Sequence, residues 1–407
     1  MERSKKFFNI LLIAIATFPI TGLKFAKFTM IFWTLTAIFF IIKYKRYRLR
    51  KNEILTVAFV SSYYLLCVFS YFFFSDYNDE GAKDLILKLP FIIFPIAIFL
   101  LRDFILTKNT LQILVFFTVA TIFSAVHVWM YIIDTGFSYM LDVDTYYNPI
   151  FRNIFSDVTG MHLPYLGIVY GFSCIIILHL ILKKDYTLKF KMVLMLGIVF
   201  LIFSIILFSA RMAIFSTILA FCYYIFNSIE RRTSIMVVLI MLLFVTVTSM
   251  LSPVQRRFDE LKEMKFSMPE FNEKSDKVNF RYGIYYCSYK ILEKKWLLGV
   301  GLGNVQNELD QCYQNFKYSN YDDFSKVKYN SHNQFLHEWM SKGIFGFVIF
   351  ITFLLYFFVN NDKMYISFLI IVVLGLFTEN LFEREVGVIF FNFFNSLFFI
   401  KSSLGNK

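Results

Sequence analysis

The sequence predicts an all-α membrane protein, and two observations on its composition support this fold class. Of the 407 residues, 58% are hydrophobic and only 17% are charged, whereas a soluble domain is roughly 45–50% apolar and about 25% charged. The apolar residues come in continuous runs of roughly 17–25, the length that crosses a hydrocarbon layer about 30 Å thick. This pattern excludes a soluble enzyme and a nucleic-acid-binding domain, although the net charge is +12. It also excludes a β-barrel, whose strands alternate.

The apolar runs predict about twelve transmembrane helices. Their approximate limits are 7–23, 25–42, 54–74, 85–101, 109–133, 161–182, 190–209, 212–229, 234–251, 343–359, 364–380 and 385–400. Only one connection is long, so we expect one large extracytoplasmic loop between helices nine and ten. The chain then divides into helices one to nine (1–251), the loop (252–342), and helices ten to twelve with a cytoplasmic tail (343–407).

The basic residues predict the orientation of these helices, because cytoplasmic loops carry an excess of Lys and Arg. With the N-terminus inside, twenty of the 41 Lys and Arg residues lie in cytoplasmic segments and about seven in short outer segments. We therefore expect both termini in the cytoplasm and the long loop on the outer side. The basic stretch 43–51 is expected to lie against anionic lipid.

The five cysteines leave one question open. Cys287 and Cys312 both fall in the outer loop, where a disulfide can form in an oxidising compartment, or both thiols can stay free. Cys67, Cys174 and Cys222 lie in predicted helices and are interpreted as packing residues. The sequence contains no metal-binding spacing of Cys and His and no nucleotide-binding motif, so we expect neither a metal nor a cofactor.

Ionisable residues in the predicted helices are few, and each is a functional candidate because charge is costly in a membrane. Nearly the whole inventory, most of it near helix ends, is His127, His162, His179, Lys88, Arg211 and Glu379. A transporter with carboxylates near the midplane is disfavoured by so sparse a set. Arg211 lies between helices seven and eight at the predicted outer boundary. Its planar guanidinium suits a phosphate, although snorkelling toward water is the alternative.

The outer loop contains a predicted helix that begins near Arg281. Phe280, Ile284, Cys287 and Ile291 recur at helical spacing and form an apolar face. Arg281 adds a guanidinium to the positive end of this helix, which favours an anion; an ordinary surface arginine is the alternative. Tyr285, one turn later, is a candidate substrate-binding residue.

Further along, residues 299–304 read Gly-Val-Gly-Leu-Gly-Asn. The βαβ context of a dinucleotide site is missing, so we predict a tight irregular turn in which glycine adopts positive φ. Asn304 at its end is a candidate substrate-binding residue. The aromatic residues of 313–329 suit either sugar recognition or packing alone.

The segment Ser331-His332-Asn333 precedes helix ten. Ser331 can serve as an N-cap of that helix. His332, at the predicted boundary of water and membrane, can act as a general base, and Asn333 is a candidate substrate-binding residue. Glu379, at the end of helix eleven, can orient a histidine or meet an arginine, and the sequence does not decide between the two.

The order of these motifs resembles the O-antigen ligase and O-antigen polymerase superfamily of bacterial envelope enzymes. The resemblance rests on an arginine at an outer helix end, an arginine that opens the loop helix, the glycine turn, and Gly343 and Gly346 at the start of the next helix. Residues 332–336, which read His-Asn-Gln-Phe-Leu, match the most specific motif. The order covers all twelve predicted helices and the one large outer loop.

The resemblance implies a metal-independent, inverting glycosyltransferase at the periplasmic face of the bacterial inner membrane, with a glycan on undecaprenyl diphosphate as donor. By resemblance, Arg211 and Arg281 hold the diphosphate and His332 takes the proton of the acceptor hydroxyl. His162, in the stretch 162–165, resembles a segment found on the same outer side.

Three functions follow from this interpretation. A ligase, which transfers a finished chain to a lipid A-core or similar acceptor, is the leading hypothesis. A polymerase, which transfers a growing chain to a new repeat unit, uses the same donor. A transporter or flippase is the alternative from another class.

Overall fold

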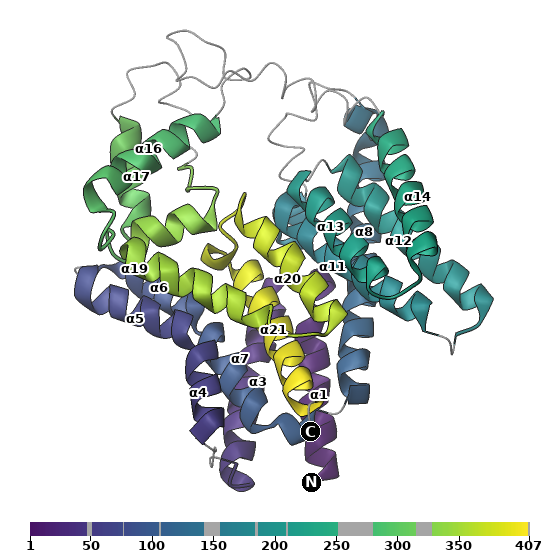
Figure 1. The fold of residues 1–407 in the computed structure, drawn as a ribbon, viewed down its shortest axis with the longest axis horizontal. Helices are drawn as coiled ribbons and strands as arrows, with labels where there is room; N and C mark the ends of the chain where they lie inside the picture. The colour runs from purple at the N-terminus through teal and green to yellow at the C-terminus, as the bar shows by residue number, and fades with distance from the viewer. Residues whose placement is uncertain are drawn as a thin grey trace.

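All regular elements of the described structure are helices, as the sequence predicts (Figure 1). The computed structural model describes residues 1–46, 51–75, 77–105, 107–141, 155–183, 186–208, 211–250, 280–314 and 328–405. The first helices are α1 (Glu2–Ala16), α2 (Phe18–Thr21), α3 (Leu23–Lys43), α4 (Lys51–Val60), α5 (Ser62–Phe74), α6 (Asp79–Lys88), α7 (Pro90–Leu100), η1 (Arg102–Phe104) and α8 (Thr107–Leu141).

The second half of the chain continues in the same way. Its helices are α11 (Leu163–Leu182), α12 (Leu188–Leu207), α13 (Arg211–Phe226), α14 (Arg231–Ser249), α16 (Phe280–Lys295), α17 (Val305–Gln314), α19 (Gln334–Phe357), α20 (Lys363–Leu376), η3 (Leu381–Glu383) and α21 (Glu385–Gly405).

The predicted count of twelve membrane spans is not confirmed. Within the described ranges, six helices are long and apolar enough to cross a membrane, and the bent pair α4–α5 adds a seventh if it is one span. The six are α3, α8, α11, α12, α14 and α19. Helices α13, α20 and α21 contain apolar stretches of 10–17 residues, which is shorter than the roughly 20 residues that a helix needs to cross a bilayer.

Breaks in the backbone explain why several predicted spans are shorter than expected. The predicted span 7–23 is interrupted at Thr17, so that α1 ends and the short α2 follows. The span 54–74 bends by 55° where α4 meets α5. The span 85–101 divides between α6 and α7, which begins at Pro90, because proline lacks the amide proton that would continue a helix.

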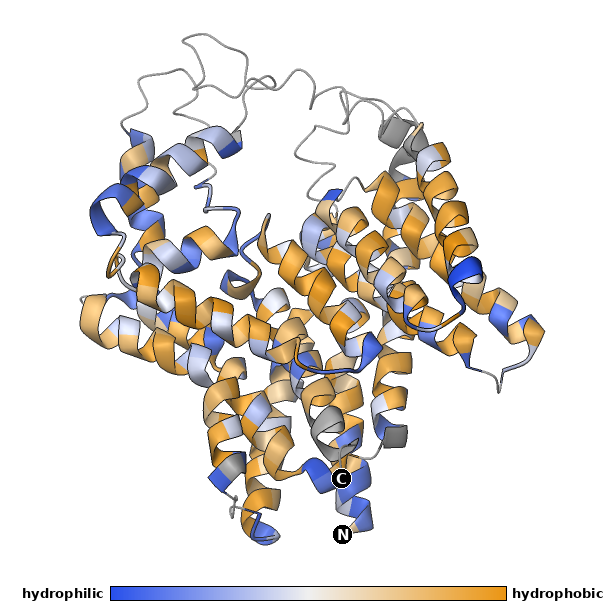
Figure 2. Ribbon diagram, in the orientation of Figure 1, coloured by the Kyte–Doolittle hydropathy of each residue, from blue (hydrophilic) through white to orange (hydrophobic). Residues whose placement is uncertain are grey.

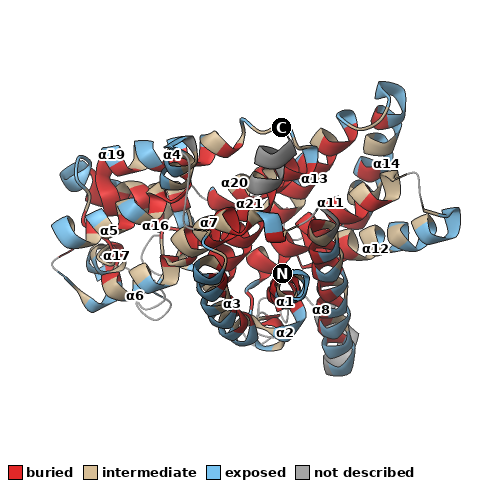
Figure 3. Cartoon of the chain, turned by 90° about the horizontal axis from the view of Figure 1, so that it is seen from below, coloured by how far each residue is buried: buried red, intermediate tan, exposed pale blue. Residues whose placement is uncertain are grey.

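Helix α11 is the most buried of the six candidate spans (Figure 3). Of the most apolar 18 residues of α11, 89% are buried, against 17% in α14 and 28% in α3. The outer helices expose large apolar side chains such as Phe28, Leu196 and Leu243, and Figure 2 shows the apolar character of these helices. An apolar exterior of this extent is the surface that a bilayer covers.

Helices α16 and α17 lie at the opposite end of the molecule from the N-terminus of α1 (Figure 1). They share a small core with the start of α19, in which Ile284 and Cys287 are buried, as the predicted apolar face requires. A disulfide joins Cys287 of α16 to Cys312 of α17, which answers the question that the sequence left open.

The glycine turn attaches this small core to the rest of the protein. Gly299, Gly301 and Gly303 all have positive φ, as predicted. A Cβ atom on Gly301 would meet the carbonyl of Phe74, and one on Gly303 would meet the backbone of Gly81. Only glycine allows the turn to approach α5 and α6 this closely.

The other side of the same turn contacts a kink in α19. Val300 and Gly301 donate backbone hydrogen bonds of 2.8 and 2.9 Å to the carbonyls of Met340 and Ser341. The helix breaks two residues later at Gly343, whose φ is 65°. The predicted start of a span at residue 343 thus corresponds to this kink.

We expect Gly301→Ala to destabilise the protein strongly, because the added methyl group meets backbone that cannot move aside. Gly197→Ala is the matched control: its Cβ would lie 3.6 Å from Ile177 Cδ1, an ordinary contact, and alanine in a helix is more stable than glycine by roughly 0.5–1 kcal/mol. Thermal unfolding of the purified protein in detergent checks both, and equal midpoints for the two variants would contradict the docking role of the turn.

Candidate functional site

The site begins at the segment that leads into α19. This helix starts at Gln334, and its N-cap is Asn333, whose side-chain oxygen accepts a hydrogen bond of 3.1 Å from the Leu336 amide. The sequence prediction of Ser331 as the N-cap is wrong. The helix begins two residues later than a Ser331 cap requires, and the Ser331 hydroxyl instead donates to the carbonyl of Asn333 at 3.1 Å.

His332 has an unusual backbone conformation. Its φ is 43°, in the left-handed region that residues other than glycine rarely adopt. Such a conformation costs roughly 1–3 kcal/mol and is typical of functional sites. The amide of His332 donates to the side chain of Asn330 at 2.9 Å, which stabilises the turn locally.

The imidazole of His332 faces a carboxylate from a distant part of the chain. Its Nδ1 lies 3.7 Å from Oε2 of Glu379, and the side chains are 29% and 13% exposed. Of the two partners that the sequence allows for Glu379, the structure places the histidine beside it. Since Nδ1 faces the carboxylate, Nε2 is the nitrogen that is left for chemistry on a substrate.

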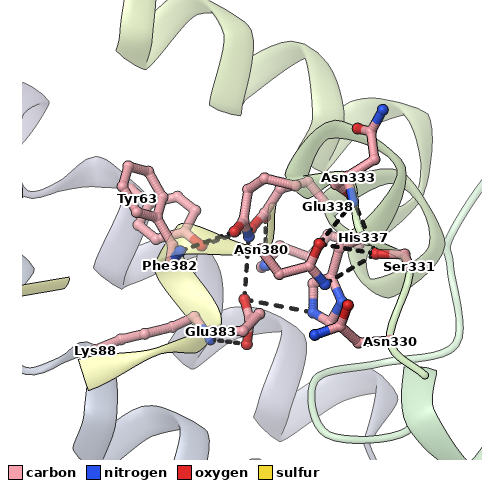
Figure 4. Close-up of polar contacts among 12 residues, drawn as sticks. Tyr63, Lys88, Asn330, Ser331, Asn333, His337, Glu338, Asn380, Phe382 and Glu383 are labelled. Carbon is pink, nitrogen blue, oxygen red and sulfur yellow. Dashed lines mark hydrogen bonds and ion pairs between the residues drawn. The ribbon is translucent and has the colours of Figure 1, made fainter. Parts of the chain in front are cut away.

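The two segments that carry this pair run side by side (Figure 4). Gln334 accepts a hydrogen bond of 2.9 Å from the backbone amide of Phe382. Its Nε2 lies within 2.8 Å of Glu338 and 3.1 Å of Glu383. One fully buried side chain therefore joins the start of α19 to the segment that follows Glu379.

Below this junction lies a cluster of charged side chains. Glu383 accepts from Lys88 at 2.6 Å and lies 3.4 Å from Nε2 of His337. Burial acts to raise the pKa of the Glu383 carboxyl, but the charges of Lys88, His337 and Lys342 outweigh burial and hold that pKa well below its usual range. Glu383 is thus a fixed anion.

A second ion pair lies within α19. Lys342 and Glu338 are fully buried side chains 2.5 Å apart, and Tyr63 of α5 donates to Glu338 at 2.6 Å. Sequence analysis noted Lys88 but missed these partners. The spacing of Glu338 and Lys342 by four residues was the available signal, because it brings two side chains together on a helix.

The remaining predicted residues lie on other elements. Arg281 is exposed in the first turn of α16, and Tyr285 lies one turn further, 37% exposed. Arg211 is the first residue of α13 and is partly buried. Helices α16 and α13 lie on either side of α20 (Figure 1).

His162 and Asn304 both have partners within the protein. His162 is the N-cap residue of α11, and its Nδ1 lies 3.0 Å from the Ser156 hydroxyl. Asn304 bonds at both ends of its amide: Oδ1 accepts from Asn78, and Nδ2 donates to the carbonyl of Val300 at 2.9 Å. The geometry of Asn304 fits a structural role in the glycine turn.

The start of α11 lies near the His332–Glu379 pair. Tyr165, in the first turn of α11, lies close to Glu379 and Arg384. On the other side, Tyr329 packs against the small core of α16 and α17, and its ring centroid lies 6.1 Å from that of His332. The pair is thus bordered by α11 and by the loop helices. The described residues contain no group of His, Cys, Asp and Glu that could hold a metal ion.

The candidate spans and the His332–Glu379 pair together describe a multi-pass membrane protein. The pair lies where α19 begins and α20 has ended. Residues 196–351 match the family model of O-antigen ligase, which confirms the resemblance stated from the motifs and indicates a membrane enzyme of the glycosyltransferase type. The matched range includes Arg211, Arg281 and His332, whereas Glu379 lies beyond it. No curated protein matches the chain.

The buried ion pair in α19 gives a testable prediction. We expect Lys342→Met or Glu338→Gln alone to destabilise the protein by about 3–5 kcal/mol, because each leaves an unpaired charge in an apolar interior. The double variant should be more stable than either single variant.

The matched control is Lys83→Met, which removes an exposed ion pair with Glu80 of 2.6 Å and should leave the unfolding midpoint unchanged. Thermal unfolding in detergent measures all four variants. Additive losses in the double variant would show that the two charges do not depend on each other.

Proposed function

We propose that the protein transfers a glycan from undecaprenyl diphosphate to a lipid A-core or similar acceptor at the periplasmic face of the bacterial inner membrane. The observation that carries this proposal is the pairing of His332 with Glu379, next to the helix with which the O-antigen ligase match ends. The disulfide between Cys287 and Cys312 supports a periplasmic position for α16 and α17, because disulfides persist in oxidising compartments.

The proposed reaction is a displacement at the anomeric carbon of the donor sugar. The acceptor hydroxyl oxygen attacks that carbon as the bond to the diphosphate oxygen breaks, which inverts the configuration. Nε2 of His332 takes the hydroxyl proton, and Glu379 stabilises the imidazolium that forms. A positioned base of this kind contributes typically 10²–10⁴-fold.

The diphosphate leaves with its bonding electron pair, so negative charge grows on it in the transition state. Arg281 and Arg211 are proposed to bind this charge, since a guanidinium offers two parallel hydrogen bonds to phosphate oxygens. Arg281 is well placed for an exposed ligand, because it lies at the N-terminal end of α16. Tyr285 follows on the same helix and is proposed to contact the donor sugars, with His162 and Asn333 as further candidates.

Two alternatives to a ligase involve the same donor. A polymerase would use the same donor and a different acceptor, and a flippase would move the donor without chemistry; the buried pair of Glu338 and Lys342 is the feature that favours transport. Expression in one bacterial strain that lacks its O-antigen ligase and in another that lacks its polymerase distinguishes the ligase from the polymerase. Long-chain lipopolysaccharide restored only in the first supports the ligase, whereas a ladder restored only in the second supports the polymerase.

We expect His332→Ala to abolish transfer while the protein stays inserted and folded, because the acceptor hydroxyl loses its base. The measurement is transfer of glycan from a lipid-linked donor by the purified variant, with its unfolding midpoint as the check on folding. Substantial transfer activity in a folded His332→Ala protein would exclude His332 as the base.

We expect Arg281→Lys to lose most of the activity, since an ammonium keeps the charge but loses the planar fork. Lys294→Arg, an exposed position near the other end of α16, is the control and should keep full activity. If Arg281→Lys were as active as the wild type, charge alone would account for the role of this residue.

A further inference from the structure

The segment that carries His332 needs support from elsewhere in the fold. His332 has positive φ and precedes the first turn of α19, so helical hydrogen bonds do not fix it. A strained conformation outside regular structure persists only where its surroundings determine it. The residues on both sides of His332 must therefore be held.

Asn380 supplies this support from the other segment (Figure 4). Its side chain is fully buried. The carboxamide oxygen accepts a hydrogen bond of 2.8 Å from the Asn333 amide, and the carboxamide nitrogen donates to the Ser331 hydroxyl at 2.9 Å. One side chain thus bonds the residue before His332 and the residue after it.

The position of Asn380 in the chain adds a second effect. Asn380 directly follows Glu379, whose carboxylate lies 3.7 Å from Nδ1 of His332. A shift of Asn380 would move Glu379 as well as the segment around His332. The positions of His332 and Glu379 therefore both depend on Asn380, although the two residues lie on different segments.

We propose that Asn380 is a positioning residue that holds His332 opposite Glu379 in the transfer reaction. This inference rests on the function proposed above, and Asn380 itself touches no reacting atom. The hydrogen bonds of Asn380 to Ser331 and Asn333 fix the distance and orientation of the imidazole. Without them, the imidazole is free to turn away from the carboxylate, and the base is no longer aligned with the acceptor hydroxyl.

The test is a double-mutant cycle on kcat and KM with the full-length protein and a lipid-linked donor. We expect Asn380→Ala and Glu379→Gln each to lower kcat about 10–100-fold, with KM for the donor unchanged, because displacement of a reacting group by about 1 Å can cost roughly 10²-fold. If Asn380 acts by holding Glu379 in place, the double variant is no slower than the slower single variant.

A merely structural asparagine would give a different result. The two losses in kcat would then multiply in the double variant, or Asn380→Ala would keep the wild-type kcat, and either result overturns the proposal. Asn392→Ala is the matched control: Asn392 is also buried, and its amide donates to the Val388 carbonyl in its own helix at 2.8 Å. This variant should keep the wild-type kcat.

Ser331→Ala gives a second route if Asn380→Ala does not fold. It removes the partner of the Asn380 amide group and leaves Asn380 in place, so it should lower kcat and show the same lack of additivity with Glu379→Gln. A wild-type protein without transfer from any lipid-linked donor would instead overturn the proposed function, and this inference with it.

Discussion

The pairing of buried charges is the constraint on which the described site depends. A single ion in an apolar interior costs several kcal/mol, so each must find a partner in a defined place. Lys88 of α6 pairs with Glu383 at the end of η3, and Lys342 pairs with Glu338 within α19. Gln334 bridges the two glutamates and makes one network of them. Three elements that are far apart in the chain are thereby joined at a single point.

The site above this network is layered by exposure. Lys88, Lys342, Glu338 and the neutral amide of Asn380 are buried. Glu383 and Glu379 are slightly exposed, and His332 is the most exposed, at 29%. This order suits a catalytic site, because the supporting groups must be rigid while a base needs access to its substrate. Glu383 is held beside Lys88, and the side chain of His332 is partly exposed.

The sequence predicted the parts of the fold that local composition determines. Long apolar runs form helices such as α11 and α12. The helical spacing of apolar residues in α16 correctly predicts the buried face of Ile284 and Cys287. The break at Thr17 has a local signal in Pro19 of α2. The kink at Gly343 lies against the backbone of Leu297, a contact that the local sequence does not indicate.

The same division applies to the candidate site. His332 and Glu379 could each be proposed from residue chemistry, but nothing local in the sequence places one opposite the other. Serine and asparagine are both good N-caps, so residue chemistry alone does not choose between Ser331 and Asn333. In the structure Asn380 bonds both residues, and α19 begins after Asn333. Asn380 itself carries no motif that could be read without the fold.

The glycine turn has a consequence for how such a protein can diversify. It brings backbone atoms of residues 300–303 against the backbone of α5, α6 and α19, in addition to the side-chain contacts of the small core. Main-chain contacts are indifferent to the identity of the neighbouring side chains. The exposed residues of α16 and α17 can therefore change during evolution while the attachment of these helices stays constant.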